Sequence, residues 1–328
     1  MRAVYRITDL IPVAALCLFT AYAAAAESQT PYPVKPVRLI VPWAPGGSTD
    51  LLARAAGQKF SESWKQAVVV DNRPGASGNI GSDIVAKAQP DGYTLLVGSM
   101  STHVMNPALF EKMPFKGVDD FEPVALMAYV RNVLVMHPSV PANSVKELIA
   151  LAKSQPGKIS YASAGVGSTN HLCAELFRKM AHVDIFHVPY KGGGPAVVDL
   201  VGGQVMIFFT GYTNVAEHVK AGRLKLLAVT ESKRAPYLPN VPTVGEFLPG
   251  YEMAVYYAMF APKGTPRTIV NQLNAEANRV LTLPEVNQRL TAIGAEPEAI
   301  TPDQLAKILR ADLAKWTKII KEIGAKAD

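Results

Sequence analysis

The sequence predicts an α/β protein with two lobes, the second of which is inserted into the first. Short buried strands alternate with amphipathic helices, a pattern that indicates a mostly parallel sheet. The alternation stops after Phe121, where one long extended segment runs from Val124 to Met136, and a second alternating block then begins. A chain of 328 residues is also too long for one ordinary domain and suits two. We therefore expect two crossings between the lobes, near residues 124–135 and 250–260, and a hinge at these crossings.

Each expected element follows from apolar periodicity and from the turn residues that bound it. In the first block we expect strands at 37–41, 68–70 and 94–98 and helices at 51–60 and 79–88. In the second block we expect strands from residue 158 and at 185–188, 205–209 and 224–229, with helices at 144–154, 171–180, 195–200 and 215–221. A strand at 253–260 and helices at 268–282 and 302–323 complete the chain.

The amino terminus has the composition of a cleavable secretory signal peptide. Arg2 and Arg6 precede an apolar run from about residue 11, which ends in the small-residue cleavage site Ala24-Ala25-Ala26. A membrane anchor is the alternative, but the run is shorter than the roughly 20 residues that a spanning helix needs. We therefore expect an exported protein that is cleaved near Ala26. The domains are assigned as the signal peptide (1–26), the first lobe (27–127 and 251–328) and the second lobe (128–250).

Two stretches share one pattern, in which a buried strand leads through a glycine-rich loop into the first turn of a helix. They are Val37–Asp50 and Lys158–Asn170. Free backbone N–H groups at a helix start bind anions, and glycine lets a ligand approach that backbone closely. Ligands of open α/β sheets also lie beyond the carboxyl ends of the strands, where these loops should meet. The sequence therefore predicts one site that holds a small acid from two sides, although the glycines could instead serve only tight turns.

The candidate ligand-binding residues lie in the loops at these strand ends and supply amides, hydroxyls, imidazoles and aromatic walls. They are Trp43, Ala44, Pro45, Gly46, Gly47, Ser48, Thr49, Ser99, Thr102, His103, Ser163, Ala164, Gly165, Gly167, Ser168, Thr169, His171, Tyr190 and Thr210. His103 and His171 could equally be ordinary polar residues. We expect Asp50 to cap the helix that it begins rather than to meet a ligand ammonium group.

Other chemistries find little support in the sequence. The formal net charge is +6, but the basic residues are spread along the chain, so we expect no nucleic-acid partner. His182 and His187 straddle a turn and a strand, and no dinucleotide loop is complete, so we expect neither a metal nor another cofactor. Cys173 should be a buried thiol. Ser168 and His171 are neighbours, and they keep open an exported α/β hydrolytic enzyme that acts on carboxylic esters or amides.

Several motifs along the chain match one family together. They are Tyr32–Pro36, Ile40–Asp50, Val70–Gly81, Pro90–Leu95, Pro189–Gly192, Val241–Glu246 and Phe260–Pro266. In these motifs the chain resembles the Bug-type extracytoplasmic solute receptors, the substrate-binding components of tripartite tricarboxylate transporters. The resemblance implies a type II-like periplasmic binding protein with a discontinuous first lobe, which closes on a small organic carboxylate and docks on membrane permease subunits. It also implies that backbone amides and ordered water at Trp43–Thr49 and Ser163–Thr169 hold one carboxylate.

Two positions depart from the family pattern. Thr210-Gly211-Tyr212 stands where many members carry an aspartate after the strand 205–209, and Tyr256 stands where tryptophan is frequent. The missing carboxylate disfavours an amino-acid ligand and favours a dianion or an aromatic acid. We therefore expect a monomeric, non-enzymatic periplasmic receptor for a mono- or dicarboxylate. The alternatives are the hydrolytic enzyme and a ligand-sensing receptor for a membrane signalling partner.

Overall fold

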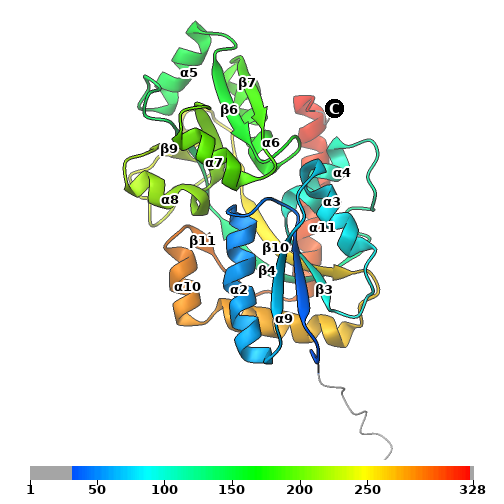
Figure 1. The fold of residues 1–328 in the computed structure, drawn as a ribbon. Helices are drawn as coiled ribbons and strands as arrows, with labels where there is room; N and C mark the ends of the chain where they lie inside the picture. The colour runs from blue at the N-terminus through cyan, green and yellow to red at the C-terminus, as the bar shows by residue number, and fades with distance from the viewer. Residues whose placement is uncertain (1–31, 326–328) are drawn as a thin grey trace, which may run out of the picture. The chain divides into compact units, whose positions relative to one another are not determined.

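The computed structural model describes residues 32–325, and the residues from Lys35 onward belong to one compact unit. The expected signal peptide, residues 1–26, lies outside the described residues. Within 32–325 the strands form two sheets, one of six strands and one of five, and we call each sheet with its helices a lobe (Figure 1). None of the helices in this range is long and apolar enough to cross a membrane. This mixed α/β architecture on two sheets confirms the predicted fold class.

The first lobe is built on the six-stranded sheet, whose strand order is β11-β4-β10-β3-β1-β2. The strands are β1 (Val37–Val41), β2 (Val68–Asn72), β3 (Thr94–Ser99), β4 (Phe121–Val130), β10 (Val255–Pro262) and β11 (Ala295–Glu296). Apolar runs in β1, β3 and β10 bury these strands almost completely. Because β10 lies between β3 and β4, a segment from late in the chain completes the sheet that the amino-terminal segment begins.

The helices of the first lobe are α2 (Ser48–Trp64), α3 (Asn79–Ala86), α4 (Asn106–Leu109), α9 (Arg267–Leu281), α10 (Pro284–Thr291) and α11 (Pro302–Ile323), with a π-helical turn at Ser101–Met105. The expected helices agree with these bounds within a few residues. The helices α4 and α10 and the π-helical turn before α4 were not expected. In α10 only Val286 and Leu290 are buried, so its apolar periodicity is too weak to stand out in the sequence.

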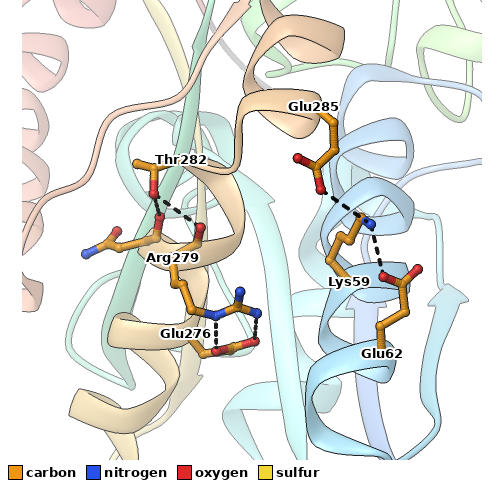
Figure 2. A network of polar contacts seen from close by, with 7 residues as sticks. Lys59, Glu62, Glu276, Arg279, Thr282 and Glu285 are labelled. Atoms are coloured by element: carbon orange, nitrogen blue, oxygen red, sulfur yellow. Dashed lines mark hydrogen bonds and ion pairs between the residues drawn. The ribbon is translucent and has the colours of Figure 1, made fainter.

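One exposed ion pair connects α2 with α10, and others lie within α2 and within α9 of the same lobe (Figure 2). Lys59 Nζ lies 3.0 Å from Glu62 in α2 and 3.6 Å from Glu285 in α10. On α9, Glu276 accepts two hydrogen bonds from Arg279 at 2.9 and 2.7 Å. Exposed pairs of this kind are screened by solvent and contribute little to the stability of the lobe.

The second lobe is built on the five-stranded sheet, whose strand order is β7-β6-β8-β5-β9. Its strands are β5 (Asn132–Met136), β6 (Ile159–Ser163), β7 (Ile185–Pro189), β8 (Ile207–Gly211) and β9 (Lys225–Val229). Its helices are α5 (Val145–Ser154), α6 (Thr169–Ala181), α7 (Gly193–Val201) and α8 (Tyr212–Lys220). A buried cluster that includes Val133, Leu200, Phe208 and Val215 joins the sheet to α7 and α8.

The prediction of mostly parallel sheets is wrong. β10 runs antiparallel to β3 and β4, and β5 runs antiparallel to β8 and β9. Parallel pairing is confined to β1 with β2 and β3, and to β6 with β7 and β8. These are the places where a helix connects successive strands. β4 instead continues directly into β5 of the other sheet, so no crossover helix sets its direction.

The chain passes between the sheets at Arg131, which separates β4 from β5, and again between β9 and β10. Both side-chain oxygens of Glu296 accept hydrogen bonds from Arg131, at 2.9 and 3.0 Å. The amide of Asn132 donates to Glu231, which follows β9, at 3.0 Å. The two crossings are therefore bonded to each other. The lobe boundaries expected at residues 127 and 250 stay predictions.

Glu231 is the least favourably placed of these charges. It is 6% exposed, and its Oε2 has no hydrogen-bond partner among the described residues. Burial raises its pKa to about 7, although the amide of Asn132 and the positive charge of Arg131 lower it in part. Ionised Glu231 thus opposes folding.

We expect Glu231→Gln to remove a pH-dependent penalty on folding. The folded-state pKa, about 7, lies above the ordinary value of 4.5, so the folded state holds this proton more tightly. Wild-type stability should therefore fall as pH rises between the two values, and the whole penalty should be present above the higher one. The substitution should raise the free energy of unfolding by about 3 kcal/mol more at pH 8 than at pH 4. Urea unfolding measures this, with exposed Glu252→Gln as the control, and an equal effect at both pH values would contradict the assignment.

Candidate functional site

A small cavity, which we call the central cavity, lies where loops of the two lobes meet. The first lobe contributes Trp43, Gly47, Ser48, Thr49, Ser99, Ser101 and Tyr257 to its lining, and the second lobe contributes Ala164, Ser168, Thr169, Asn170, Gly193 and Asn214. Its volume is about 30 Å³, which is room for one or two water molecules. Most of the lining follows the carboxyl ends of β1, β3, β6 and β8, where ligands of α/β sheets bind.

The helices α2, α6, α7 and α8 all begin at the central cavity. Ser48 and Thr169 are the first residues of α2 and α6. Gly193 is the first residue of α7, and Asn214 lies in the first turn of α8. The first N–H groups of a helix have no acceptor within the helix and carry partial positive charge. Both lobes therefore direct positive helix ends at one small space, which suits an anion.

The start of α2 is open because its N-cap is Gly47, which has no side chain to accept from the helix amides. The same holds for α7 and α8, whose N-caps are Gly192 and Gly211. The start of α6 is different, because the Ser168 hydroxyl accepts from the amide of His171 at 3.3 Å. Side-chain capping leaves the first two amides of a helix free. The amides of Thr169 and Asn170 are the ones that α6 can offer to a ligand.

None of the described residues that line the central cavity has a charged side chain. Their polar side chains are hydroxyls and carboxamides, which stay neutral near physiological pH. Burial raises the pKa of Tyr257 to about 12, although a hydrogen bond with Ser48 lowers it, so this phenol also keeps its proton. An anion would therefore meet fixed dipoles and neutral donors rather than a countercharge.

The carboxylate of Asp50 fixes the first glycine loop and is not part of the cavity lining. It accepts a hydrogen bond from the amide of Gly46 at 3.0 Å. The prediction that Asp50 caps its own helix is therefore wrong. Arg54 and Asn72 each donate to it at 3.0 Å. Burial works to raise the pKa of Asp50, but the hydrogen bonds from Arg54, Gly46 and Asn72 outweigh burial and lower it. The negative charge is thus compensated away from the cavity.

The second glycine loop satisfies most of its own amides. Gly165 N donates to Ser163 Oγ at 3.0 Å, and Gly167 N donates to His171 Nδ1 at 3.2 Å. Ser168 N donates to the carbonyl of Gly165 at 3.1 Å. This loop therefore acts as a rigid support for the start of α6, and its own amides already have partners.

The two lobes touch directly beside the central cavity. Ala44 N donates to the carbonyl of Lys191 at 3.0 Å. Ser48 Oγ lies 2.5 Å from Thr213 Oγ1. A Cβ atom placed on Gly194 would lie 2.3 Å from the carbonyl oxygen of Pro45. The described arrangement is therefore closed, and the glycines of the second lobe are needed where backbone meets backbone.

Some candidate residues point into the protein core and not into the cavity. The His103 ring stacks on Phe260 at 3.8 Å, and its Nδ1 lies 2.8 Å from the hydroxyl of Thr102. Burial lowers the pKa of His103 to about 3, so the ring is neutral. Thr210 lies behind the lining, where its hydroxyl accepts from Asn214 at 2.8 Å. Thr210 therefore orients a lining residue.

The Ser168 hydroxyl is not paired with the imidazole of His171. It donates instead to the carbonyl of Gly165 at 2.7 Å. Ser163 Oγ does lie 2.5 Å from His187 Nε2, but Ser163 has no exposed surface and already accepts from an amide. Neither serine therefore has the exposed hydroxyl and free base that nucleophilic attack needs.

The candidate residues divide into groups. Those that line the central cavity are Trp43, Gly47, Ser48, Thr49, Ser99, Ala164, Ser168 and Thr169. Gly165 and Tyr190 line a second cavity beside it. Those outside both linings are Ala44, Pro45, Gly46, Thr102, His103, Ser163, Gly167, His171 and Thr210. For all of these candidate residues, contact with a ligand stays a prediction.

Sequence reasoning did not select five residues that line the central cavity: Ser101, Asn170, Gly193, Asn214 and Tyr257. The first four lie in segments that follow a strand and lead into a helical turn. A candidate set that included the first turn of each helical segment after a strand would have contained them. Tyr257 carries no such signal, because it lies inside a strand in the centre of the sheet.

Comparison with known proteins shows the family to which the chain belongs. Residues 52–325 match the model of the tripartite tricarboxylate transporter family receptor. BugT of Bordetella pertussis is 39% identical over 321 residues, which are 97% of this chain and 98% of BugT. The structure of R. palustris Rpa4515 with adipate has 38% identity and a TM-score of 0.88, and covers 90% of this chain and 99% of that chain. MatC (Rpa3494) of Rhodopseudomonas palustris with bound malate has 34% identity and a TM-score of 0.84, and covers 88% of this chain and all 100% of its own.

These similarities confirm the resemblance seen in the sequence motifs. The family consists of periplasmic solute receptors and is not an enzyme family. The match extends over most of the chain and includes the mixed α/β fold on two sheets. The chain is therefore a solute-binding protein that belongs to the tripartite tricarboxylate transporter receptor family.

Proposed function

We propose that this protein captures a small organic mono- or dicarboxylate in the periplasm and presents it to the permease subunits of a tripartite transporter. The convergence of helix N-termini from both lobes carries the proposal, because it favours an anion without using a charged side chain. Adipate and malate, which two related structures hold, belong to this ligand class. The segment Thr210-Gly211-Tyr212 lacks the aspartate that many family members carry there, and its absence favours a dianion or an aromatic acid over an amino acid.

Lobe closure is the mechanism we propose for capture. The start of α2 belongs to the first lobe, whereas α6, α7 and α8 begin in the second. An anion contacts both groups of amides only when the lobes are together. It therefore shifts the population toward the closed form by its differential affinity for the two forms. The permease then distinguishes the closed, ligand-bound form from the open form.

The protein is proposed to act in the periplasm and to bind its ligand without catalysis. The composition of residues 1–26 supports export, as in the periplasmic family members. The role of Ser168 as a helix cap supports a receptor without catalysis. We propose that it works as a monomer and needs no cofactor.

A charge placed at the start of α6 should abolish binding without unfolding the protein. In Thr169→Asp the new carboxylate would occupy the free amides of α6 and repel an anion, but an acid at this position stabilises a helix by about 0.3–1 kcal/mol. Affinity for carboxylates should fall by about 100-fold or more, given a charge repulsion of about 4 kcal/mol near a protein surface. Thr169→Asn is the matched neutral control and should bind within about tenfold of the wild type.

Isothermal titration calorimetry with adipate, malate and matched monocarboxylates measures this difference. Equal binding by Thr169→Asp and Thr169→Asn would contradict an anion at the start of α6. A wild-type protein that binds no carboxylate would refute the proposed function itself.

Closure can be tested separately through Gly194. A methyl group there meets the carbonyl of Pro45 at 2.3 Å, so Gly194→Ala should hold the lobes apart and weaken ligand binding by about tenfold or more. Alanine also favours a helix over glycine by about 1 kcal/mol, so stability should not fall. Gly202→Ala, after the other end of α7, places its methyl 3.4 Å from the nearest atom and is the control.

Small-angle scattering with and without ligand measures the change in radius of gyration alongside affinity. Unchanged affinity and full ligand-induced compaction in Gly194→Ala would show that the described backbone contact is not part of the ligand-bound form.

A further inference from the structure

A buried carboxylate lies at the crossings between the sheets and is not part of the cavity lining. Glu231 follows β9, at the start of the second crossing, and only 6% of it is exposed. Its Oε1 accepts a hydrogen bond from the amide of Asn132 at 3.0 Å, which joins the two crossings. Its Oε2 has no hydrogen-bond partner among residues 32–325. An unpartnered buried charge is costly, so this carboxylate needs an explanation that packing alone does not give.

The groups around Glu231 do not neutralise it. Arg131 is the cation beside it, but both side-chain oxygens of Glu296 accept hydrogen bonds from this guanidinium, at 2.9 and 3.0 Å. The other ionisable neighbours keep their protons near neutral pH, because burial raises the pKa of each. They are Cys173, Tyr237 and Tyr251. Ionised Glu231 therefore leaves this cluster with one excess negative charge, and protonated Glu231 leaves it neutral.

A short chain of contacts leads from Glu231 to the central cavity. Asn132, whose amide donates to Glu231, also donates through its side chain to Cys173 Sγ at 3.0 Å. Cys173 lies one turn after Thr169, which begins α6 and lines the cavity, and one turn of an α-helix advances by about 5.4 Å. Burial raises the pKa of the Cys173 thiol, and the negative charge of Glu231 raises it further. The charge of Glu231 is therefore felt within one turn of the anion site.

Tyr257 connects the same cluster with the wall that the first lobe contributes to the cavity. Burial raises the pKa of Tyr257 to about 12, a hydrogen bond with Ser48 lowers it, and interaction with Cys173 raises it. Cys173 thus lies between Glu231 and a residue of the lining. Cys173 has no exposed surface, so the medium between the two sites is protein rather than water. Charges in such a medium are screened weakly.

An anion in the central cavity and a negative charge on Glu231 therefore disfavour each other. The anion binds more tightly when Glu231 is protonated, and by linkage the bound anion makes Glu231 hold its proton more tightly. Burial raises the pKa of Glu231 to about 7, and a bound carboxylate shifts this pKa further upward. Tight binding is then present below this range and weakens as the pH rises through it.

We propose that Glu231 is a proton-binding site linked to the ligand site, so that capture of a carboxylate takes up a proton. The proton comes from solvent and is held on the Glu231 carboxylate, and no covalent bond of the ligand changes. This inference rests on the proposed function, since it requires an anion in the central cavity. The receptor then loads most tightly in an acidic periplasm and releases its ligand more readily as the pH rises.

The other ionisable side chains named around the cavity keep one protonation state between pH 6.5 and pH 8.5. Burial lowers the pKa of His103 to about 3 and that of His187 to about 4, and it also lowers the pKa of His171. Tyr257 and Cys173 keep their protons. Carboxylic acids, with pKa values of about 4 to 5, are ionised throughout this range. A change in affinity over this range therefore reports on Glu231.

The test measures dissociation constants for adipate and malate by calorimetry at pH 6.5 and pH 8.5. The proteins are the wild type, Glu231→Gln and Glu252→Gln. Glutamine keeps an oxygen for the Asn132 amide and cannot ionise. Glu252 is exposed and lies in the same crossing, so its variant is the matched control. Titrations of the wild type at pH 7.5 in HEPES and in Tris, which differ in ionisation enthalpy, count the protons taken up without any substitution.

We expect the wild-type affinity to fall by about fivefold from pH 6.5 to pH 8.5, with about half a proton taken up at pH 7.5. Glu252→Gln should behave as the wild type does. Glu231→Gln should bind with nearly the same affinity at both pH values and take up no proton. Thermal unfolding without ligand verifies that both variants fold, and the wild-type proton count decides the question if Glu231→Gln does not.

Two results would overturn the linkage and leave the proposed function standing. One is a wild type that binds carboxylates equally well at both pH values and takes up no proton. The other is a pH dependence that persists unchanged in Glu231→Gln. A wild type that binds neither adipate nor malate at either pH would overturn the linkage and the proposed function together.

Discussion

The positive ends of helices from both lobes meet across a space with room for one or two waters, and this meeting constrains the rest of the structure. Like ends of helix dipoles repel, so closing the lobes without an anion is electrostatically unfavourable. An anion between them turns the repulsion into attraction from both sides. In the proposed mechanism the same groups would thus oppose closure in the empty protein and favour it in the complex, which is what a ligand-driven two-state movement requires.

Charge is arranged around this space so that the helix ends determine its potential. The nearest carboxylate to the first loop, Asp50, is bonded to Gly46, Arg54 and Asn72 and does not line the cavity. The lining itself is neutral, and even the pKa of Tyr257 lies at about 12. The field that the lining presents to an anion therefore does not vary with protonation near neutral pH.

Much of the fold and about half of the site follow from local sequence, and the remainder depends on contacts between distant segments. Strand, glycine loop and helix start are adjacent in the chain, so β1 with α2 and β6 with α6 could be predicted together with their loops. The position of His103 could not, because a π-helical turn directs its ring onto Phe260, a residue of a distant strand. Tyr257 was missed for the same reason. It reaches the cavity because β10 enters the centre of the sheet, and no local pattern specifies that insertion.

The helix α6 connects the central cavity with the two crossings between the sheets. Its first residue, Thr169, lines the central cavity, and Cys173 lies one turn further along. Asn132, at the first crossing, donates to Cys173 Sγ at 3.0 Å, and Tyr251, in the second crossing, donates to the Cys173 carbonyl at 3.0 Å. Burial raises the pKa of this thiol well above its ordinary range, so Cys173 acts here as a neutral, inert packing group. In the proposed mechanism, an anion that draws α6 toward α2 would therefore act on a helix that is bonded to both crossings.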